Sequence, residues 1–439
     1  MPARPRHAPI LSVIPAIVAG TLLVGCAAAP PSPSATAIVA SASPALTPPP
    51  SARPVPSAPP SLSPSPTPTA PGPGEAPAGP WTRVDWIAAG DVLPLGPSNV
   101  GVYGWSRGYV AVRAIGGDSG DGSGEPFTLT TSSSADGLRW TPARSADVAG
   151  LVGGAELGGI VEGPDGLLMF GRPLPDTCGG PPTVSALWTS RDGETWRRVT
   201  LPSSFGSNRV ATLEGGSAGY IATGLRSDGK TPLIWTSADG ARWRVAPLPH
   251  VTSGSLLVDG GTSFQGGLVV VGALVGPEGC GGVSSIHPSI WWSRDGTSWT
   301  REALAGASTS AHATMSIRRL SDHAVAAFEQ TGGDETLQGW VSTDGRTWAP
   351  VAKPSGLAAF GLVTDGRHAA TIVDPGSESG PPTVATFDDR LVMTTVSQSG
   401  DGPVASPDEL GWTFAVGPTG VLVARYDGTA VWLGVPASS

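Results

Sequence analysis

The sequence predicts an all-β fold: a seven-bladed β-propeller of four-stranded antiparallel blades, with a six-bladed ring as the alternative. Three observations predict this fold. A Ser-x-Asp-Gly-x-x-Trp segment recurs at intervals of 47 to 56 residues. An apolar strand that follows a polar turn, which contains Gly in most copies, precedes each segment, and no convincing helical periodicity occurs. Four short strands repeated at this period are typical of propeller blades.

The composition excludes several classes of protein. The 439 residues include 62 Gly and 46 Pro, only 14% charged residues and three Cys. A coiled coil would contain little Gly or Pro, and a disulfide-dense small domain would contain more Cys. The net charge of −9 argues against nucleic acid as a partner, because nucleic-acid binders need a basic surface.

Residues 1–25 are predicted to be a lipoprotein signal peptide. Arg4 and Arg6 precede an apolar run over residues 10–23, which is signal-peptide length and short for a membrane span. The run ends in Leu23-Val24-Gly25-Cys26, which resembles a bacterial lipobox and implies that Cys26 is lipidated. We therefore expect a lipid anchor in the cell membrane, with the chain on the extracytoplasmic face. The alternatives are an ordinary secretory signal with a chance Cys, or a poor membrane helix.

Residues 26–80 are predicted to be the lipidated Cys followed by a disordered tether. Pro, Ser, Thr and Ala fill most of this stretch, and its charged residues are Arg53 and Glu75. Such a segment has too little apolar surface to bury and favours extended polyproline II backbone.

Residues 81–439 are predicted to form the propeller. Five intact copies of the recurring segment predict hairpin turns, because Gly accepts a positive φ and Asp accepts hydrogen bonds from nearby backbone N–H groups. The Ser, Asp and Trp residues that the five copies share are Ser134, Asp136 and Trp140; Ser190, Asp192 and Trp196; Ser237, Asp239 and Trp243; Ser293, Asp295 and Trp299; and Ser342, Asp344 and Trp348.

Seven copies of the preceding turn and apolar strand raise the number of repeats to seven. The sixth hairpin segment is interpreted as degenerate at residues 387–390, and the seventh as Asp427-Gly428 with Trp432. Residues 81–86, WTRVDW, match the strand that follows each intact segment. We therefore expect this N-terminal strand to pair in the last blade and close the ring, which leaves no free sheet edge there.

The recurring segment resembles the Asp-box, or bacterial neuraminidase repeat, of sialidase-like propellers. The resemblance covers nearly all of residues 81–439 and implies the fold, with the Asp-box residues in a structural role. It implies no catalytic residue. A sialidase needs an arginine cluster, an acid/base Asp and a Tyr nucleophile assisted by Glu, yet the family's Arg-Ile-Pro segment is absent and only four Tyr occur. Glu156, Glu214 and Asp259 lie near predicted inner strands, but nothing in the sequence pairs them.

Ligand recognition is expected on the ring face that carries the irregular loops, because binding residues concentrate on such loops. The candidates lie on the three longest connections between the second and third strands of a repeat: Asp118, Asp121, Glu125, Asp176, Glu278 and His287. We expect no metal site and no cofactor; Ca²⁺ held by the acidic residues of segment 117–125 is the open alternative.

Cys178 and Cys280 occur in Cys-Gly-Gly segments of two of these loops. A disulfide between them is predicted for an exported protein, with two free thiols as the alternative.

The predicted function is a monomeric, membrane-anchored, non-catalytic module that binds a protein, glycan or cell-wall partner. A glycoside hydrolase of sialidase-like fold, of the exo-sialidase type, is the alternative. A purely structural surface module is a third interpretation.

Overall fold

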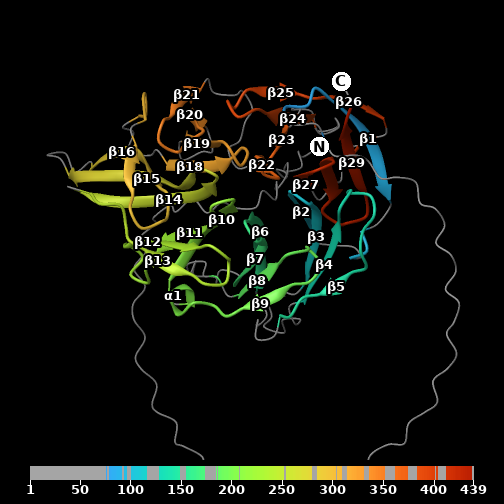
Figure 1. The fold of residues 1–439 in the computed structure, drawn as a ribbon, viewed down its shortest axis with the longest axis horizontal. Helices are drawn as coiled ribbons and strands as arrows, with labels where there is room; N and C mark the ends of the chain where they lie inside the picture. The colour runs from blue at the N-terminus through green and yellow to red at the C-terminus, as the bar shows by residue number, and fades with distance from the viewer. Residues whose placement is uncertain are drawn as a thin grey trace, which may run out of the picture. The chain divides into compact units, whose positions relative to one another are not determined.

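The described chain folds into seven β-sheets that stand as blades around a ring (Figure 1). This computed structural model describes residue 76 and residues 79–437, except 91–92, 96–99, 116–127, 149–154, 174–183, 185, 207, 252–253, 279–283, 303, 309–313, 331–335, 352–360, 374–382, 401 and 404–411. The predicted seven-bladed propeller is confirmed, and the six-bladed alternative is wrong.

Six of the seven blades are built from strands that follow one another in the chain, from the inner edge of the ring outwards. Blades one to three contain β2 (Val100–Trp105), β3 (Gly108–Ile115), β4 (Thr128–Ser134) and β5 (Arg144–Ser145); β6 (Ala155–Gly163), β7 (Gly166–Pro173), β8 (Ala186–Ser190) and β9 (Arg197–Val199); β10 (Arg209–Gly216), β11 (Gly219–Leu225), β12 (Pro232–Ser237) and β13 (Arg244–Ala246). The helix α1 (Ser203–Gly206) connects blades two and three.

Blades four to six follow the same order, and blade seven adds a strand from the N-terminal end of the propeller. Blades four to six contain β14 (Ser255–Phe264), β15 (Gly267–Glu278), β16 (Ser284–Ser293) and β17 (Thr300–Glu302); β18 (Thr314–Arg319), β19 (Val325–Gln330), β20 (Thr336–Ser342) and β21 (Ala349–Val351); β22 (Val363–Thr364), β23 (Ala369–Val373), β24 (Thr383–Phe387) and β25 (Met393–Thr395). Blade seven contains β27 (Trp412–Gly417), β28 (Gly420–Arg425), β29 (Val431–Pro436), β1 (Arg83–Gly90) and β26 (Ser397–Gly400).

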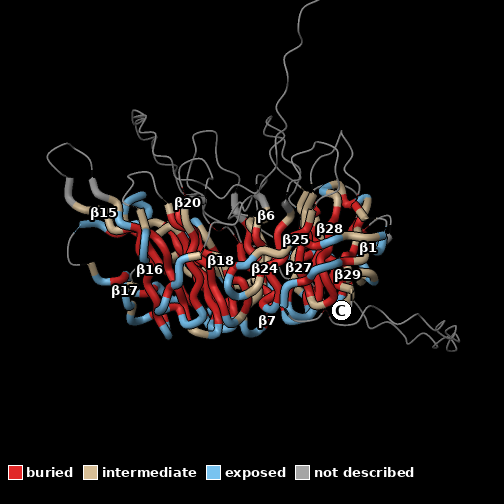
Figure 2. The backbone as a smooth tube through the Cα atoms, turned by 90° about the horizontal axis from the view of Figure 1, so that it is seen from above, coloured by how far each residue is buried: buried red, intermediate tan, exposed pale blue. Residues whose placement is uncertain are grey.

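The antiparallel order of the strands sorts their connections onto two faces. The turns between the first and second strands and between the third and fourth strands lie on one face, which we call the turn face. The other connections lie on the opposite face, which we call the loop face. Figure 2 shows the ring from the side, with buried residues inside the layer of strands and exposed residues at its rims. The predicted division into two faces follows from this topology.

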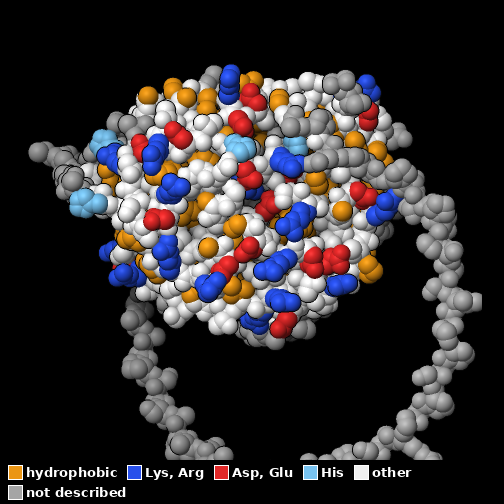
Figure 3. All heavy atoms as spheres, viewed as in Figure 1, with side chains coloured by type: hydrophobic (Ala, Val, Ile, Leu, Met, Phe, Trp, Pro, Cys, Tyr) orange, Lys and Arg blue, Asp and Glu red, His pale blue; other side chains and the backbone are white. Residues whose placement is uncertain are grey.

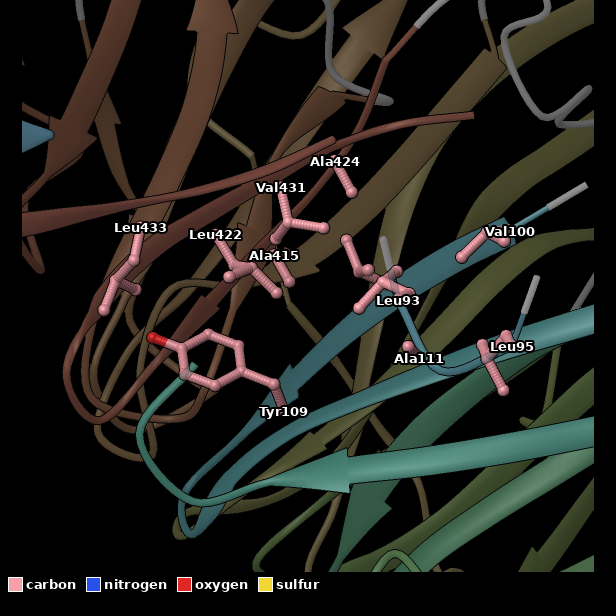
Figure 4. Close-up of a cluster of buried hydrophobic side chains, with 11 residues drawn as sticks. Leu93, Leu95, Val100, Tyr109, Ala111, Ala415, Leu422, Ala424, Val431 and Leu433 are labelled. Carbon is pink, nitrogen blue, oxygen red and sulfur yellow. The ribbon is translucent and has the colours of Figure 1, made fainter. Parts of the chain in front are cut away.

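Hydrophobic side chains fill the space between neighbouring blades. The buried hydrophobic residues of the described chain form seven clusters, and each joins two adjacent sheets. Figure 4 shows the cluster between blades seven and one, where Tyr109 and Ala111 of β3 meet Leu422 and Leu433 of β28 and β29. Because strands buried on both faces read as continuous apolar runs, the inner strands lack a simple alternation of apolar and polar residues.

The N-terminal strand closes the ring as predicted. β1 pairs antiparallel with β29, with Val84 opposite Pro436 and Ile87 opposite Leu433. On its other edge β1 pairs in parallel with the short strand β26, so that blade seven has a fifth strand that the sequence did not predict. Val84 is fully buried between the two neighbouring strands.

The chain enters blade seven from the turn face. The backbone N–H of Ala76 donates to the carbonyl of Pro418, which lies in the turn between β27 and β28. Trp81 is 3% exposed, its backbone N–H donates to Thr386 Oγ1 at 3.0 Å, and its ring lies 4.9 Å from that of His368. These contacts fix the segment before β1 between blades six and seven.

The predicted seventh hairpin segment was placed wrongly. Asp427 and Gly428 connect β28 to β29, which are the second and third strands of blade seven. The turn therefore belongs to the loop face. The position between the third and fourth strands of this blade is instead taken by the end of β29 and the start of β1, because the fourth strand comes from the other end of the chain.

Candidate functional site

The five intact Asp-Gly segments form the same hydrogen-bonded turn. In blade two, Ser190 Oγ accepts from the N–H of Gly193 at 2.9 Å, and Asp192 Oδ1 accepts from the N–H groups of Glu194 and Thr195 at 2.9 and 2.7 Å. The Gly residues of the five turns have φ values from 71° to 78°, in the left-handed region that glycine favours. The equivalent Ser and Asp residues repeat these bonds at Ser134 and Asp136, Ser237 and Asp239, Ser293 and Asp295, and Ser342 and Asp344.

These hydrogen bonds keep the Asp carboxylates of the turns ionised. Burial would raise the pKa of Asp239, but the N–H and guanidinium donors of Arg242 and the N–H of Ala241 outweigh it and lower the pKa to about 2. The hydroxyl of Thr297 has the largest effect on Asp295, whose pKa is also about 2. These carboxylates accept hydrogen bonds from their own turns and so stabilise the hairpins. Because their pKa values are low, they are ionised near neutral pH and do not act as proton donors.

In blades two to five, two Trp residues flank each Asp-Gly turn, and they are buried to different degrees. Trp188, Trp235 and Trp340 on the third strands are completely buried, and the indole N–H of Trp188 and Trp340 donates to Asp147 and Ala305 carbonyls of the preceding connection. The Trp residues of the segments themselves, Trp140, Trp196, Trp243 and Trp299, are half-buried, and only Trp348 is buried.

The degenerate sixth segment still forms a turn. Asp388 Oδ1 accepts from the N–H groups of Arg390 and Val392, at 2.9 and 2.8 Å. Leu391 has a φ of 61° and takes the left-handed conformation that Gly takes in the other turns. A non-glycine residue in this conformation is strained, and the burial of the Leu391 side chain, which is 3% exposed, compensates for that strain.

Charged side chains meet across the axis of the ring near the turn face. Glu162 is in β6 of blade two and Arg319 in β18 of blade five, and Arg319 Nη2 lies 3.5 Å from Glu162 Oε2. Their side chains are only 12% and 8% exposed. Ser106 of blade one donates its N–H to Glu162 Oε1 at 3.1 Å. Because blades two and five are not neighbours, this contact must cross the axis.

The two charged residues occupy equivalent positions in their blades. Glu162 pairs with Leu167, as Arg319 pairs with Val325, and each partner lies opposite the Ser that begins the turn of its blade. In blade one this position must be small, because a Cβ at Gly104 would lie 1.6 Å from the carbonyl oxygen of Val416. The inner strands thus converge near the turn face, and the Glu162–Arg319 pair lies where they converge.

Two more carboxyl groups lie on inner strands of adjacent blades. Glu214 is in β10 of blade three, and Asp259 is in β14 of blade four at an irregularity in the pairing with β15. Both are half-buried. Burial raises the pKa of Glu214, which Arg318 and Arg319 oppose without reversing it. Burial also raises the pKa of Asp259 to about 6, against one hydrogen bond from the N–H of Met315 at 3.0 Å.

We call Glu162, Glu214, Asp259, Arg318 and Arg319 the axial cluster. The positive charge of Arg319 opposes the rise in pKa of Glu162, and Arg318 and Arg319 oppose that of Glu214. The sequence singled out Glu214 and Asp259 but could not connect them, and it missed Glu162, Arg318 and Arg319. A usable signal was the equivalent position of Glu162 and Arg319, directly before the turns to the second strand.

The tyrosines are held in ways that disfavour a nucleophilic role. Tyr109 and Tyr220 donate their hydroxyls to the Gly420 and Gly166 carbonyls of the preceding blade, both at 2.9 Å. Burial raises the pKa of both hydroxyls. Burial also raises the pKa of Tyr103 to about 12. A Tyr nucleophile needs the opposite change, because only its phenolate attacks efficiently.

Most residues predicted for the ligand face lie outside the described residues. This holds for Asp118, Asp121, Glu125 and Asp176, for the side chain of Glu278, and for the loop cysteines Cys178 and Cys280. Cys26, the predicted lipidation site, also lies outside the described residues. The strands that flank the three long connections do end at the loop face, because β3, β7 and β15 all run away from the turn face. His287 is exposed in β16, opposite Leu274.

Blade four extends further towards the loop face than its neighbours. β14, β15 and β16 have 10, 12 and 10 residues, and β15 and β16 remain paired from Leu268 and Ser293 to Glu278 and Ser284. In Figure 2 the end of β15 rises at the rim of the ring. Leu257, near the loop-face end of β14, is 41% exposed.

Neither a metal centre nor a membrane-spanning helix is found within the described ranges. No group of three or more His, Cys, Asp or Glu residues there is arranged to hold a metal ion. No helix in the same part of the chain is long and apolar enough to cross a membrane.

Comparison with solved structures finds distant propellers. The β-propeller domain of the Trilobed protease from Pyrococcus furiosus is 10% identical, with a TM-score of 0.40 over 76% of this chain and 93% of that one. The Trypanosoma rangeli sialidase is 11% identical, with a TM-score of 0.33 over 73% and 59%. The Bombyx mori GH32 β-fructofuranosidase BmSUC1 is 12% identical, with a TM-score of 0.29 over 82% and 90%. No protein-family model and no curated protein matches the sequence.

Proposed function

We propose that this protein is a non-catalytic binding module, attached to the outside of the cytoplasmic membrane by a lipid on Cys26, whose loop face binds a protein, glycan or cell-wall partner. The observation that carries the proposal is the hydrogen bonding of Glu162 and of two tyrosine hydroxyls. Glu162 is bonded to Arg319 and Ser106, and the Tyr109 and Tyr220 hydroxyls are bonded to backbone carbonyls. These groups stabilise the ring, so they are not available for glycoside hydrolysis.

The extended end of blade four supports the choice of face. It carries an exposed apolar residue, Leu257, and an exposed His287, both near the loop-face end of the blade. Partner-binding surfaces commonly combine an apolar contact with neighbouring polar groups.

A matched pair of variants tests this face. Leu257 and Val392 are both exposed apolar residues, at 41% and 56%, but Leu257 lies towards the loop face and Val392 next to the sixth turn. We expect Leu257→Arg to weaken binding of isolated cell wall and envelope glycans at least tenfold and Val392→Arg to leave it unchanged. Equal binding by both variants would contradict the proposed face.

The anchor needs a separate experiment. Cys26→Ala should move the full chain from the membrane fraction to the soluble extracytoplasmic fraction, because a thiol at this position is required for lipid attachment. Continued retention in the membrane fraction would count against lipidation.

One observation favours the alternative, a glycoside hydrolase. Glu214 and Asp259 lie on inner strands of adjacent blades, and the pKa of both is raised, as a general acid requires. The test is hydrolysis of a panel of fluorogenic glycosides, including sialosides, by the full chain. Turnover that Glu214→Gln or Asp259→Asn abolishes would establish the enzyme and exclude the non-catalytic module. If the full chain hydrolyses none of these glycosides and still binds a partner, the result supports the non-catalytic binding module.

A further inference from the structure

The hollow between the turns of blades three and four contains an unusual number of arginines. It has a volume of about 360 Å³ and lies on the turn face, between the hairpins around Asp239 and Asp295. Its lining includes Arg242, Arg244 and Arg294, with Trp243, Tyr220 and Leu268 as the apolar part. This volume is at the small end of the range for ligand pockets and suits one sugar ring.

Each of the three guanidinium groups has N–H donors for which the described residues provide no acceptor. Arg244 is oriented by bonds from Nε to Thr236 Oγ1 at 3.2 Å and from Nη2 to the Asp295 carbonyl. Arg242 donates Nε to Asp239 Oδ2 at 2.7 Å, and no described residue accepts from its Nη groups. Arg294 is exposed and forms no hydrogen bond or ion pair with any described residue.

The acidic groups at the hollow offset only part of this positive charge. Asp295 lines the hollow as a carboxylate, whose oxygen accepts from the N–H and hydroxyl of Thr297. Asp239 balances Arg242 from its own turn. Two of the three arginines therefore remain without a carboxylate partner among the described residues, next to the half-buried ring of Trp243.

The other blade junctions provide an internal comparison, because the same turn recurs around the ring. At the junction of blades one and two, the positions equivalent to the three arginines hold Arg139, Thr141 and Arg191, and at the junction of blades four and five they hold Ser298, Thr300 and Thr343. The turn alone therefore does not require three arginines. Their convergence at one junction points to a ligand with negative charge.

We propose that this hollow binds an acidic sugar, with its carboxylate or phosphate held by Arg242, Arg244 and Arg294 and its ring packed against Trp243. Arginine recognises both anions because its planar donors match two oxygen atoms at once. An anionic membrane surface is a poorer match, since basic and acidic side chains are interspersed over the ring face in Figure 3. The site is distinct from the loop face and independent of the function proposed above.

Calorimetric titration of the full chain with glucuronate, glucose 6-phosphate and glucose tests the proposal. We expect at least one acidic sugar to bind and glucose to bind at least tenfold more weakly. Arg294→Ala should weaken binding about tenfold, because the variant loses charge-assisted hydrogen bonds. Arg294 makes no contact that the fold needs, so this variant should keep the wild-type melting temperature.

The control variant is Arg191→Ala, which removes the equivalent exposed side chain at the junction of blades one and two. It should bind the acidic sugar with wild-type affinity. The proposal is overturned if neither acidic sugar binds, if glucose binds equally well, or if Arg294→Ala binds as tightly as Arg191→Ala. Binding only to vesicles of equal parts phosphatidylglycerol and phosphatidylcholine would also overturn it, and would assign the arginines to a lipid surface.

Discussion

At the scale of single residues, the Trp on the third strand of a blade and the Trp that ends the Asp-Gly segment stabilise the fold in different ways. In blade three, Trp235 is completely buried, while Trp243 is half-buried against Phe205, with ring centroids 5.1 Å apart. Trp235 thus contributes mainly by filling the space between sheets, and Trp243 by covering the edge of the turn through its bond to the Gly240 carbonyl at 2.8 Å.

Alanine substitution should separate these roles. We expect Trp235→Ala to lower the free energy of unfolding by about 3–5 kcal/mol, as large-to-small changes in a closed core do, and Trp243→Ala by about 1–2 kcal/mol. Urea unfolding monitored by circular dichroism gives both values. A larger loss for Trp243→Ala would show that the turn contributes more than the core of this blade.

A second residue-scale prediction concerns pH. The pKa of Asp259 rises from 3.8 to about 6 on folding, so the folded state binds this proton more tightly than the unfolded state. The free energy of unfolding therefore falls as pH rises from about 4 to about 6, and the loss is complete above that range. Asp259→Asn should remove this loss, because its amide oxygen can still accept from Met315.

The measurement is the difference in unfolding free energy between Asp259→Asn and the wild type at two pH values. We expect the variant to be more stable by up to about 2 kcal/mol at pH 7.5 and equal to the wild type near pH 3.5. Comparing the two proteins at each pH cancels the titration of Glu162 and Glu214. A difference that does not change with pH would refute the assignment.

At the scale of elements, the ring depends on a strand contributed from the other end of the propeller sequence. β1 is hydrogen-bonded on both edges, by β29 and by β26. Without it, β29 would expose an unpaired edge along its whole length, and such edges promote aggregation.

Two truncations test this dependence. Removing residues 1–75 should shift the melting temperature by less than about 2 °C, because the contacts of Ala76, Trp81 and β1 remain. Removing residues 1–90 should abolish cooperative unfolding or lower the melting temperature by more than about 10 °C. Scanning calorimetry decides, and equal melting temperatures would mean that β1 does not close the ring.

The sequence predicts elements well where their signals are local. Each Asp-Gly turn is specified by a few adjacent residues, so its position could be found without a structure. The match between residues 81–86 and the other outer strands was also sufficient to predict β1. β26 could not be predicted, because its four residues pair only through contact with a strand more than 300 residues away. The seventh turn was misassigned because Asp-Gly also suits a connection on the loop face.

At the scale of the whole molecule, the axial cluster links blades two and five, which are not neighbours in the ring. Glu162 and Arg319 are separated by 157 positions in the sequence. Their equivalent positions before the turn connect them in the sequence, but those positions do not specify that these two blades meet, because the ring must close first. This explains why the turns were predictable and the axial cluster was not.

A double-mutant cycle measures this link. Arg319→Met leaves the buried Glu162 without its ion-pair partner and should cost about 3 kcal/mol. Glu162→Gln leaves Arg319 paired with Asp322 at 2.9 Å and should cost less, with a coupling energy of at least about 1 kcal/mol between Glu162 and Arg319. The exposed pair of Arg83 and Asp85, at 2.9 Å, is the control and should couple by less than about 1 kcal/mol. Equal coupling in both pairs would show that the axial contact does not bind the blades together.

The closing strand also places the two ends of the folded region side by side. Val84 lies opposite Pro436, and the N–H of Ala437 donates to the Arg83 carbonyl at 3.1 Å. A short peptide could therefore connect them covalently, and the chain could be cut instead at the exposed turn of residues 226–231 in blade three. In such a circular permutant each blade would still pack between the same two blades, because a closed ring has no first or last sheet.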